Sequence, residues 1–244
     1  MPANKGTILF VHGMCHGAWC WEPYFLPYFE QLGYHCMVIN LRGHEQPGST
    51  RLINHLGIED YVADIQKAVS LLDEPPIIIS HSMGGRVVQE YLKVGVCKKA
   101  ILMASVPPQS VLSTTFRIIS KNIGIIRFLL KRDLLSAFKH YDQLMFGSNI
   151  SPKNVANYKS KMCSESFRVY LQLLKPISRM PNERKIPMLV VGGTNDNIFT
   201  TKEIQNTASF YNADIILIEG AGHDLMLEPE YEKTAEIILE WIGR

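Results

Sequence analysis

Residues 77–85 read Ile-Ile-Ile-Ser-His-Ser-Met-Gly-Gly. The three β-branched residues predict a buried strand, and the sequence favours a helix from Met83 onward. A chain that reverses so sharply from strand to helix leaves Ser82 at the apex of the turn, in a backbone conformation that only small neighbours allow. The pattern therefore predicts a nucleophile elbow, which holds a serine hydroxyl above the end of a parallel sheet.

The elbow departs from its usual form at one position. The pattern is normally Gly-x-Ser-x-Gly, and here it reads Ser80-x-Ser82-x-Gly84. Serine is small enough for the crowded first position, so the match is weakened but kept. Because such a string is common and serine is also a frequent helix N-cap, the prediction depends on the strand before it and the helix after it.

A serine nucleophile needs a histidine base and a carboxylate that orients the imidazole. In the elbow architecture both follow the serine along the chain. The predicted strand 186–191 leads into a loop that ends at Asp196, and the strand 215–218 leads into a glycine-containing loop that reaches His223. We therefore predict Ser82 as nucleophile, Asp196 as acid and His223 as base.

Each of the three residues also has a simpler explanation when it is taken alone. Asp196 could cap the helix predicted near 200–210, and His223 could be an ordinary loop histidine. Asp224 and Glu219 compete with Asp196, although a residue adjacent to His223 rarely turns back to its ring. The order of all three residues at strand ends favours the triad.

The loop after the first predicted strand, residues 7–11, carries Gly13 and Gly17. A tetrahedral intermediate needs backbone N–H groups aimed at its oxyanion, each worth about 3–4 kcal/mol in a well-studied case. The two glycines free the backbone for that approach. We predict the N–H groups of Met14 and Met83 as the donors, the second because it follows the nucleophile.

Metal, cofactor and nucleic-acid binding have little support in the sequence. His12 and His16 share the loop after the first strand, but they lack a convincing third ligand. No aromatic-interleaved basic stripe and no recognisable nucleic-acid motif occur. We therefore expect structural roles for both histidines, no metal, no cofactor and no nucleic-acid partner.

At these motifs the chain resembles the α/β-hydrolase-fold serine hydrolases, from about Thr7 to Ile242. Residues 12–21, His-Gly-Met-Cys-His-Gly-Ala-Trp-Cys-Trp, are particularly similar to the methylesterase and hydroxynitrile lyase branch, and Leu-Arg-Gly-His at 41–44 is similar to the superfamily loop after the second strand. That branch includes esterases, thioesterases, lyases, cofactor-free oxygenases and hormone receptors. The resemblance therefore indicates the fold, but it leaves the substrate open.

The composition fits a single soluble α/β domain. At 244 residues with 46% hydrophobic content, the chain is long enough to bury a full core. No N-terminal stretch resembles a signal peptide, so we expect none, and no apolar run approaches the ~20 residues that span a bilayer. Five scattered cysteines form no disulfide or zinc pattern. We expect a cytoplasmic protein with reduced thiols and no stable membrane insertion, and the sequence leaves its oligomeric state open.

Strand and helix patterns alternate over both ends of the chain, which predicts a parallel sheet covered on both faces. We expect an α/β-hydrolase fold with a mostly parallel six-stranded sheet. Parallel strands share one C-terminal edge, where the predicted site residues would meet. The predicted strands are 7–11, 36–41, 76–80, 99–105, 187–193 and 214–218, and the predicted helices are 21–32, 58–72, 83–94, 201–210 and 231–241.

Residues 107–180 break the alternation. They carry helical patterns at 114–121, 124–146, 152–162 and 164–175. We predict an α/β-hydrolase core at 1–106 and 181–244, with 107–180 as a helical cap (lid) over the strand ends that determines specificity. Its apolar residues, which would line a pocket or form the core of the cap, include Phe116, Ile119, Ile126, Phe128, Leu129, Leu134, Phe138, Leu144 and Met145.

Charge changes at the same boundary. Residues 107–180 contain 12 Lys or Arg against 3 Asp or Glu, whereas the remainder of the chain has 13 against 20. Such a basic segment would attract an anionic substrate, a carrier-bound acyl group or an acidic membrane surface. A solvated lysine-rich helix face, or pairing between cap and body, explains the same counts.

Together these features predict a cofactor-free serine hydrolase that cleaves a carboxylic ester of a small to medium apolar acid through an acyl-enzyme. The predicted partner is a small-molecule ester, with anionic or lipid-like esters among those that fit. Alternatives with the same triad are acyl-thioester cleavage and hydroxynitrile-lyase-like chemistry. A small-molecule receptor with slow turnover is a further alternative, although pure binding has no need of all three residues.

Overall fold

A computed structural model of the chain describes residues 5–47, 51–177 and 186–244. Six strands form one sheet, in which every pair of neighbouring strands is parallel. The predicted six-stranded α/β sheet is confirmed, and the strand ends lie within two residues of their expected positions. In sheet order the strands are β2 (His35–Ile39), β1 (Thr7–Val11), β3 (Ile77–His81), β4 (Lys99–Met103), β5 (Met188–Gly193) and β6 (Asp214–Ile218).

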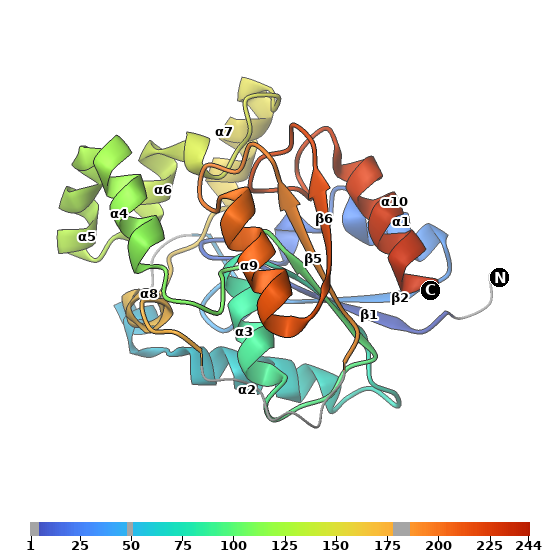
Figure 1. The fold of residues 1–244 in the computed structure, drawn as a ribbon. Coiled ribbons are helices and arrows are strands. Elements are labelled where there is room, and N and C mark those ends of the chain that lie inside the picture. Colours follow the sequence, from blue (N-terminus) through green and yellow to red (C-terminus); the bar gives the residue numbers. More distant parts are fainter. Residues whose placement is uncertain (1–4, 48–50, 178–185) are drawn as a thin grey trace.

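Helices cover both faces of the sheet, as Figure 1 shows. Helices α1 (Phe25–Gln31) and α10 (Tyr231–Ile242) pack together on one face, and α2 (Ile58–Val69) and α3 (Met83–Tyr91) pack together on the other. Helix α9 (Thr201–Tyr211) packs against β5. Two short 3-10 helices, η1 (Ala18–Cys20) and η2 (Arg51–His55), lie in the loops. Because helices cover both faces, every residue of β3 and β5 is buried, which accounts for their continuous apolar runs.

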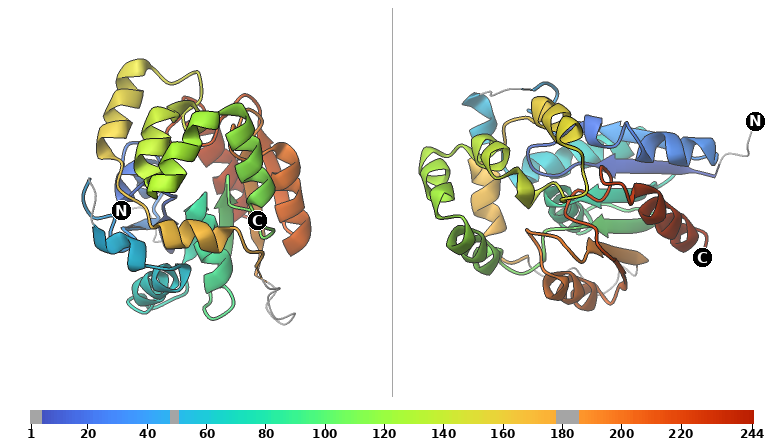
Figure 2. Two further views of the ribbon diagram at one scale, coloured as in Figure 1. Left: turned by 90° about the vertical axis from the view of Figure 1, so that its left-hand side faces the viewer. Right: turned by 90° about the horizontal axis from the view of Figure 1, so that it is seen from above.

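A group of helices, called the inserted helices below, lies between β4 and β5 in the chain. In Figure 1 they form the end of the molecule opposite the two termini, and the left panel of Figure 2 looks directly onto them. They are α4 (Leu112–Lys121), η3 (Ile123–Ile125), α5 (Ile126–Lys131), α6 (Leu134–His140), η4 (Asp142–Leu144), α7 (Pro152–Lys161) and α8 (Phe167–Leu173).

The inserted helices contact the C-terminal edge of the sheet. The Cys163 N–H donates to the carbonyl oxygen of Cys15 in the loop after β1, at 3.0 Å. The Asp224 N–H in the loop after β6 donates to the carbonyl oxygen of Met145, at 3.2 Å. The inserted helices therefore lie against the loops that carry the predicted site residues.

Arg86 on α3 holds both ends of this insertion. Its buried guanidinium donates to the carbonyl oxygens of Pro107, at 3.0 Å, and Lys175, at 2.8 Å. The two ends also meet directly, because the Ile177 N–H donates to the carbonyl oxygen of Pro108 at 2.7 Å. The insertion is thus attached to the helix that follows Ser82.

The single long helix predicted at 124–146 is wrong. Helix α5 ends where Arg132 adopts a left-handed φ of 57°, a conformation that cannot continue a right-handed helix. Asp133 then caps α6 by accepting a hydrogen bond from the Ser136 N–H at 3.0 Å. The helices predicted at 114–121, 152–162 and 164–175 correspond to α4, α7 and the shorter α8. The predicted boundary at 180/181 lies outside the described residues.

Across the described ranges, no helix combines the length and the apolar character that crossing a membrane requires.

Candidate active site

Ser82 lies at the turn between β3 and α3, with φ of 50° and ψ of −116°. This conformation is strained for a residue with a side chain, and main-chain bonds hold it. The Ser82 N–H donates to the Met103 carbonyl oxygen, and the Ser82 carbonyl accepts from the Val106 N–H, both at 3.0 Å. A Cβ atom at Gly84 would lie only 2.3 Å from the His12 carbonyl oxygen. Glycine at this position therefore lets α3 approach the end of β1 closely.

Ser80 fills the position where the elbow pattern usually has glycine. Its side chain is fully buried, and its hydroxyl donates to the carbonyl oxygen of Ile101 on β4 at 3.0 Å. The departure from the pattern therefore leaves no buried hydroxyl unpaired.

The structure brings the three predicted side chains into one hydrogen-bonded chain. His223 Nε2 lies 3.0 Å from Ser82 Oγ, and His223 Nδ1 lies 2.8 Å from Asp196 Oδ2. The other carboxylate oxygen of Asp196 accepts from the N–H groups of Ile198, at 2.7 Å, and Phe199, at 3.0 Å. These bonds fix the carboxylate, orient the imidazole and leave its second nitrogen next to the serine hydroxyl.

The charges around His223 favour its protonated form. Burial by itself lowers the pKa of this imidazole, but the Asp196 carboxylate, supported by Asp224 and Glu228, outweighs burial and raises the pKa above its ordinary value. The neighbouring ring of His81, 4.9 Å away between centroids, behaves oppositely. Burial, together with repulsion from His223, lowers the pKa of His81 to about 3. Of the two rings, His223 is therefore the one suited to accept a proton near neutral pH.

The two competing carboxylates do not reach the His223 ring. Asp224 is fully buried, and its Oδ2 lies 3.1 Å from His16 Nε2. Burial raises the pKa of Asp224, but the nearby histidines, His16 foremost, outweigh burial and lower it, so Asp224 is a second buried anion beneath the site. Glu219 is exposed. Asp196 is the carboxylate whose geometry matches an orienting role.

The loop after β1 lies directly against Ser82. A Cβ atom at Gly13 would lie 3.0 Å from Ser82 Cβ and 2.7 Å from His81 Nδ1. Met14 follows Gly13, and Met83 follows Ser82, so both predicted donor residues are next to the elbow. Within the described residues, neither the Met14 nor the Met83 N–H donates to a main-chain acceptor of a loop or turn.

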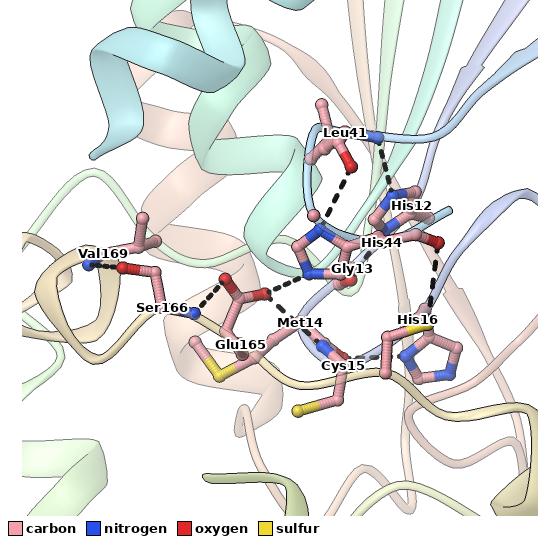
Figure 3. Close-up of polar contacts among 12 residues, drawn as sticks. His12, Gly13, Met14, Cys15, His16, Leu41, His44, Glu165, Ser166 and Val169 are labelled. Carbon is pink, nitrogen blue, oxygen red and sulfur yellow. Dashed lines mark hydrogen bonds and ion pairs between the residues drawn. The ribbon is translucent and has the colours of Figure 1, made fainter. Parts of the chain in front are cut away.

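His12 sets the direction of the Met14 N–H. Its Nε2 accepts from the Leu41 N–H at 3.1 Å, so its Nδ1 carries the proton and donates to the Gly13 carbonyl oxygen at 2.9 Å. That carbonyl belongs to the same peptide unit as the Met14 N–H, and the two groups of a trans peptide point in opposite directions. Figure 3 shows this arrangement. His12 is therefore a structural residue that anchors the predicted oxyanion loop.

The alpha/beta hydrolase family model matches residues 8–237 of the chain. The chain belongs to the α/β hydrolase family. The family predicted from the motifs is thus confirmed over nearly the whole chain.

Individual relatives share between a quarter and about a third of their residues with this chain where they align. Methylesterase 4 from Arabidopsis thaliana is 34% identical over 85 residues, which cover 34% of this chain and 32% of that protein. The chain thus matches about a third of the length of that methylesterase, and the resemblance to the methylesterase branch is confirmed over this part. Phospholipase YtpA from Bacillus subtilis (strain 168) is 26% identical over 247 residues, which cover 93% of this chain and 90% of that protein.

Solved structures extend the similarity of fold to the whole chain. Polyneuridine aldehyde esterase matches with a TM-score of 0.75 at 17% identity, covering 98% of this chain and 100% of that one. Bromoperoxidase from Bacillus anthracis matches with a TM-score of 0.75 at 18% identity, covering 100% of this chain and 93% of that one. Structures with these differing names share the fold, so the fold alone does not identify the reaction.

Glu165 is a buried residue of this α/β hydrolase that the sequence did not point out. It lies between α7 and α8, and its carboxylate accepts from the Tyr61 hydroxyl, at 2.8 Å, and the Ser166 N–H, at 2.7 Å. Its Oε2 also lies 3.0 Å from His44 Nε2 and 3.4 Å from the Cys15 nitrogen. Figure 3 shows the carboxylate reaching the loops after β1 and β2. The only available signal was that no other acidic residue occurs between residues 143 and 182.

The segment around Glu165 holds a strained residue of the hydrolase beside Met14. Cys15 adopts a left-handed φ of 60°. Its carbonyl oxygen accepts from the Cys163 N–H at 3.0 Å, and its own N–H points to Glu165 Oε2 at 3.4 Å. Both groups come from the insertion, which therefore fixes the conformation of the loop that carries one predicted oxyanion donor.

The described residues contain one group of His, Cys, Asp or Glu side chains close enough to share a metal ion. It consists of His81, His223 and Asp224, whose ligand atoms all lie within 4.8 Å of one another. Both ring nitrogens of His223 already contact Asp196 and Ser82, and His81 Nε2 lies 3.1 Å from the His223 carbonyl oxygen. Metal binding would break the hydrogen-bonded chain, so these residues do not fit a metal site.

An apolar cavity of about 70 Å³ lies between the inserted helices and Met14 of the hydrolase. Five of the predicted lining residues surround it, namely Ile119, Leu129, Leu134, Phe138 and Leu144. The prediction is wrong for Phe116 and Ile126, which are 63% and 39% exposed because they lie on the outer sides of their helices. Phe128 and Met145 do not line the cavity but have the other predicted role, since Met145 is buried in the core and Phe128 packs against it. The remaining lining residues are Met14, Thr115, Ile118, Ile125, Ala137 and Tyr170.

Proposed function

We propose that this α/β hydrolase is a serine esterase that cleaves a carboxylic ester of a small to medium apolar acid through an acyl-enzyme. The observation that carries the proposal is the hydrogen-bonded chain from Ser82 through His223 to Asp196, set at a strained elbow. An activated serine needs this arrangement, whereas a structural serine has no use for it. The similarity to a methylesterase supports ester cleavage in particular.

The proposed reaction has two halves. His223 takes the proton of Ser82 while Oγ attacks the ester carbonyl, and the resulting oxyanion is stabilised by the N–H groups of Met14 and Met83. His223 then returns the proton to the alkoxide, and the alcohol leaves. Water then attacks the acyl carbonyl with His223 again as base, the bond from the carbonyl carbon to Ser82 Oγ breaks, and His223 returns the proton to Oγ as the acid leaves. Asp196 stays ionised throughout and stabilises the imidazolium.

The cavity above Met14 supports an apolar acyl group. Among the described residues that line it there is no Lys, Arg, Asp or Glu, so they offer no charge partner for an anionic acid. Its volume of about 70 Å³ is smaller than that of an apolar cavity of roughly 150 Å³ that binds benzene. The size favours a short acyl chain. We propose that the inserted helices act as the cap that determines this specificity.

The cavity also bears on the alternative functions. A hydroxynitrile lyase would need a cation beside the nitrile, and none of the described side chains that line the cavity is cationic. Thioester cleavage uses the same groups and differs only in the leaving group. A receptor with slow turnover would keep the same geometry and differ in rate. We place the protein in the cytoplasm, because all five cysteines are free thiols and Cys15, Cys20, Cys97 and Cys163 are buried.

Two assays of the full chain and its Ser82→Ala variant test the proposal. A fluorophosphonate probe should label the wild-type protein and leave the variant unlabelled, because only an activated serine reacts. Hydrolysis of p-nitrophenyl esters of graded acyl length should show a maximum at short chains and vanish in the variant. The matched acyl-thioester separates the esterase from a thioesterase. Esterase activity that persists in a folded Ser82→Ala variant would overturn the assignment.

A further inference from the structure

The outer side of three inserted helices exposes many large apolar side chains. Half of the strongly exposed large apolar residues among those described lie between residues 112 and 130. The exposed fractions reach 63% for Phe116, 77% for Ile123 and 80% for Leu130. We call this the α4–α5 surface, and its apolar members are Leu112, Phe116, Ile123, Ile126 and Leu130.

The spacing of these residues places them on common sides of the helices. Leu112 and Phe116 are four residues apart on α4, and Ile126 and Leu130 are four apart on α5. Residues four apart lie one above the other on a helix. The left panel of Figure 2 shows α4 and α5 side by side at the front of the molecule, away from the sheet.

The opposite sides of the same helices are apolar as well. Ile118, Ile119, Ile125 and Leu129 line the cavity above Met14. A helix that is apolar on both sides is expected to be covered on both sides. In the monomer the inner side is covered and the outer side is not, so the outer side calls for a partner.

Positive charge surrounds the exposed apolar residues. Lys121, Arg127, Lys131 and Arg132 are exposed on the same segment, and residues 107–132 contain no Asp or Glu. In the described part of the chain none of the four has an acidic partner, and Arg127 contacts His140 and the Phe128 ring instead. The partner must therefore supply both an apolar phase and negative charge.

We propose that the α4–α5 surface binds the surface of a membrane that contains anionic lipids. Such a membrane supplies acyl chains for the exposed Phe, Ile and Leu side chains and anionic head groups for the four cations, each worth about 1 kcal/mol. A second copy of the chain would offer the apolar area but would bring its own four cations against the four of the first copy. The bound helices would place the cavity for the acyl group beside the lipid, where apolar esters concentrate. Membrane binding itself does not depend on the proposed esterase activity.

Vesicle co-sedimentation tests the proposal on the full chain. The Ser82→Ala variant is used, so that lipid hydrolysis cannot consume the vesicles. We expect it to sediment with vesicles of phosphatidylcholine and phosphatidylglycerol, to stay in solution with phosphatidylcholine alone, and to dissociate as salt is added. Failure to sediment with the anionic vesicles at low salt would overturn the proposal, and it would leave the proposed esterase activity intact.

Paired variants locate the binding surface. Ile123→Ser with Leu130→Ser, and separately Lys131→Glu with Arg132→Glu, should each weaken binding to anionic vesicles by about tenfold or more. The matched controls lie on or beside α2: Leu71→Ser, at a side chain that is 74% exposed, and Lys67→Glu, at an exposed lysine. Both controls should bind like the parent.

Two further measurements complete the test. All variants should keep the thermal unfolding midpoint of the parent. When the same substitutions are made in the protein that retains Ser82, a soluble short-chain ester should be hydrolysed at unchanged rates, because none of the changed residues lines the cavity. An equal loss of vesicle binding in the control variants would overturn the assignment of binding to this surface. So would light scattering that shows a dimer in the absence of vesicles and a monomer after the Ile123 and Leu130 substitutions, since the occupant would then be a second copy.

Discussion

Glu165 Oε2 lies 3.0 Å from His44 Nε2, and both side chains are completely inaccessible to solvent. The contact joins the insertion to the loop after β2. Burial lowers the pKa of His44, but the charge and hydrogen bond of Glu165 outweigh burial and raise it above its ordinary value. The pair is therefore a buried ion pair over part of the neutral pH range, and removing one partner leaves the other uncompensated.

The first prediction concerns stability and its dependence on pH. Glu165→Gln removes the charge that favours protonated His44, which should cost about 3–5 kcal/mol of unfolding free energy at low pH. The pKa of His44 is raised in the folded state. The stabilisation by the ion pair is therefore complete below the pKa of His44 in the unfolded chain, about 6.5, and is lost as pH rises through its pKa in the folded protein. Urea unfolding of both proteins from about pH 5.5 to about pH 8.5 measures the difference. A difference in unfolding free energy between the two proteins that grows with pH would contradict the ion pair.

The second prediction concerns rate. Because Glu165 and Cys163 hold strained Cys15 beside Met14, Glu165→Gln should displace the proposed oxyanion donor at Met14 and lower kcat by up to about 100-fold with little change in KM. Affinity for a boronate transition-state analogue should fall by the same factor, while affinity for the product acid should stay. Equal losses for both ligands would indicate general damage and not a positioning role.

The third prediction concerns Ser82, the proposed nucleophile. Ser82→Ala should lower kcat by as much as about a millionfold, the effect of removing the serine from a comparable triad. Stability should change little, since alanine keeps the same strained φ of 50° and the same main-chain bonds. Ester hydrolysis and thermal unfolding measure the two effects.

The fourth prediction separates the two carboxylates near His223. Asp196→Asn should lower kcat by about 10⁴-fold, whereas Asp224→Asn should mainly lower stability, because Asp224 pairs with His16 and not with the His223 ring. The base must be neutral to act, so activity rises with pH through the raised pKa of His223. That rise should move to lower pH in Asp196→Asn. A larger kcat loss in Asp224→Asn would reverse the assignment.

The fifth prediction concerns the cavity. Ala137 lies on α6 and lines the cavity, so Ala137→Leu reduces the space in it. The substitution should lower kcat/KM for a long-chain ester by about tenfold or more relative to the acetate ester. The control is Leu130→Ala, which removes an exposed side chain from the other side of the inserted helices. The ratio of the two ester activities measures the effect, and an unchanged ratio would place the acyl group elsewhere.

Much of the architecture could be predicted from local sequence patterns. The continuous apolar run at 77–79 identifies a strand buried on both faces, and the same pattern marks β5. Once the strands are parallel, all residues that follow them share one edge, so Ser82, Asp196 and His223 could be named together before any contact was known. The topology brings these residues to one edge of the sheet, whereas the hydrogen bonds between them are a feature of the tertiary structure.

Long-range contacts could not be read in this way. Glu165 meets Cys15 across 150 residues, and no local pattern distinguishes a buried carboxylate from one in solvent. The break at Arg132 depends on how α5 and α6 pack, because neither Arg132 nor Asp133 excludes a longer helix by itself. The same holds for Phe116, which is apolar and outward-facing while its neighbour Ile119 lines the cavity.

The amino-acid sequence by itself therefore determined the strands, the elbow and the order of the three site residues, because these depend on side-chain periodicity and on turn chemistry within a few residues. The tertiary structure alone decided which carboxylate contacts His223, which buried acid holds the loop beside Met14, and which side of α4 and α5 faces the cavity. Those outcomes depend on burial and on charge pairing between distant segments, and such interactions exist only once the chain has packed.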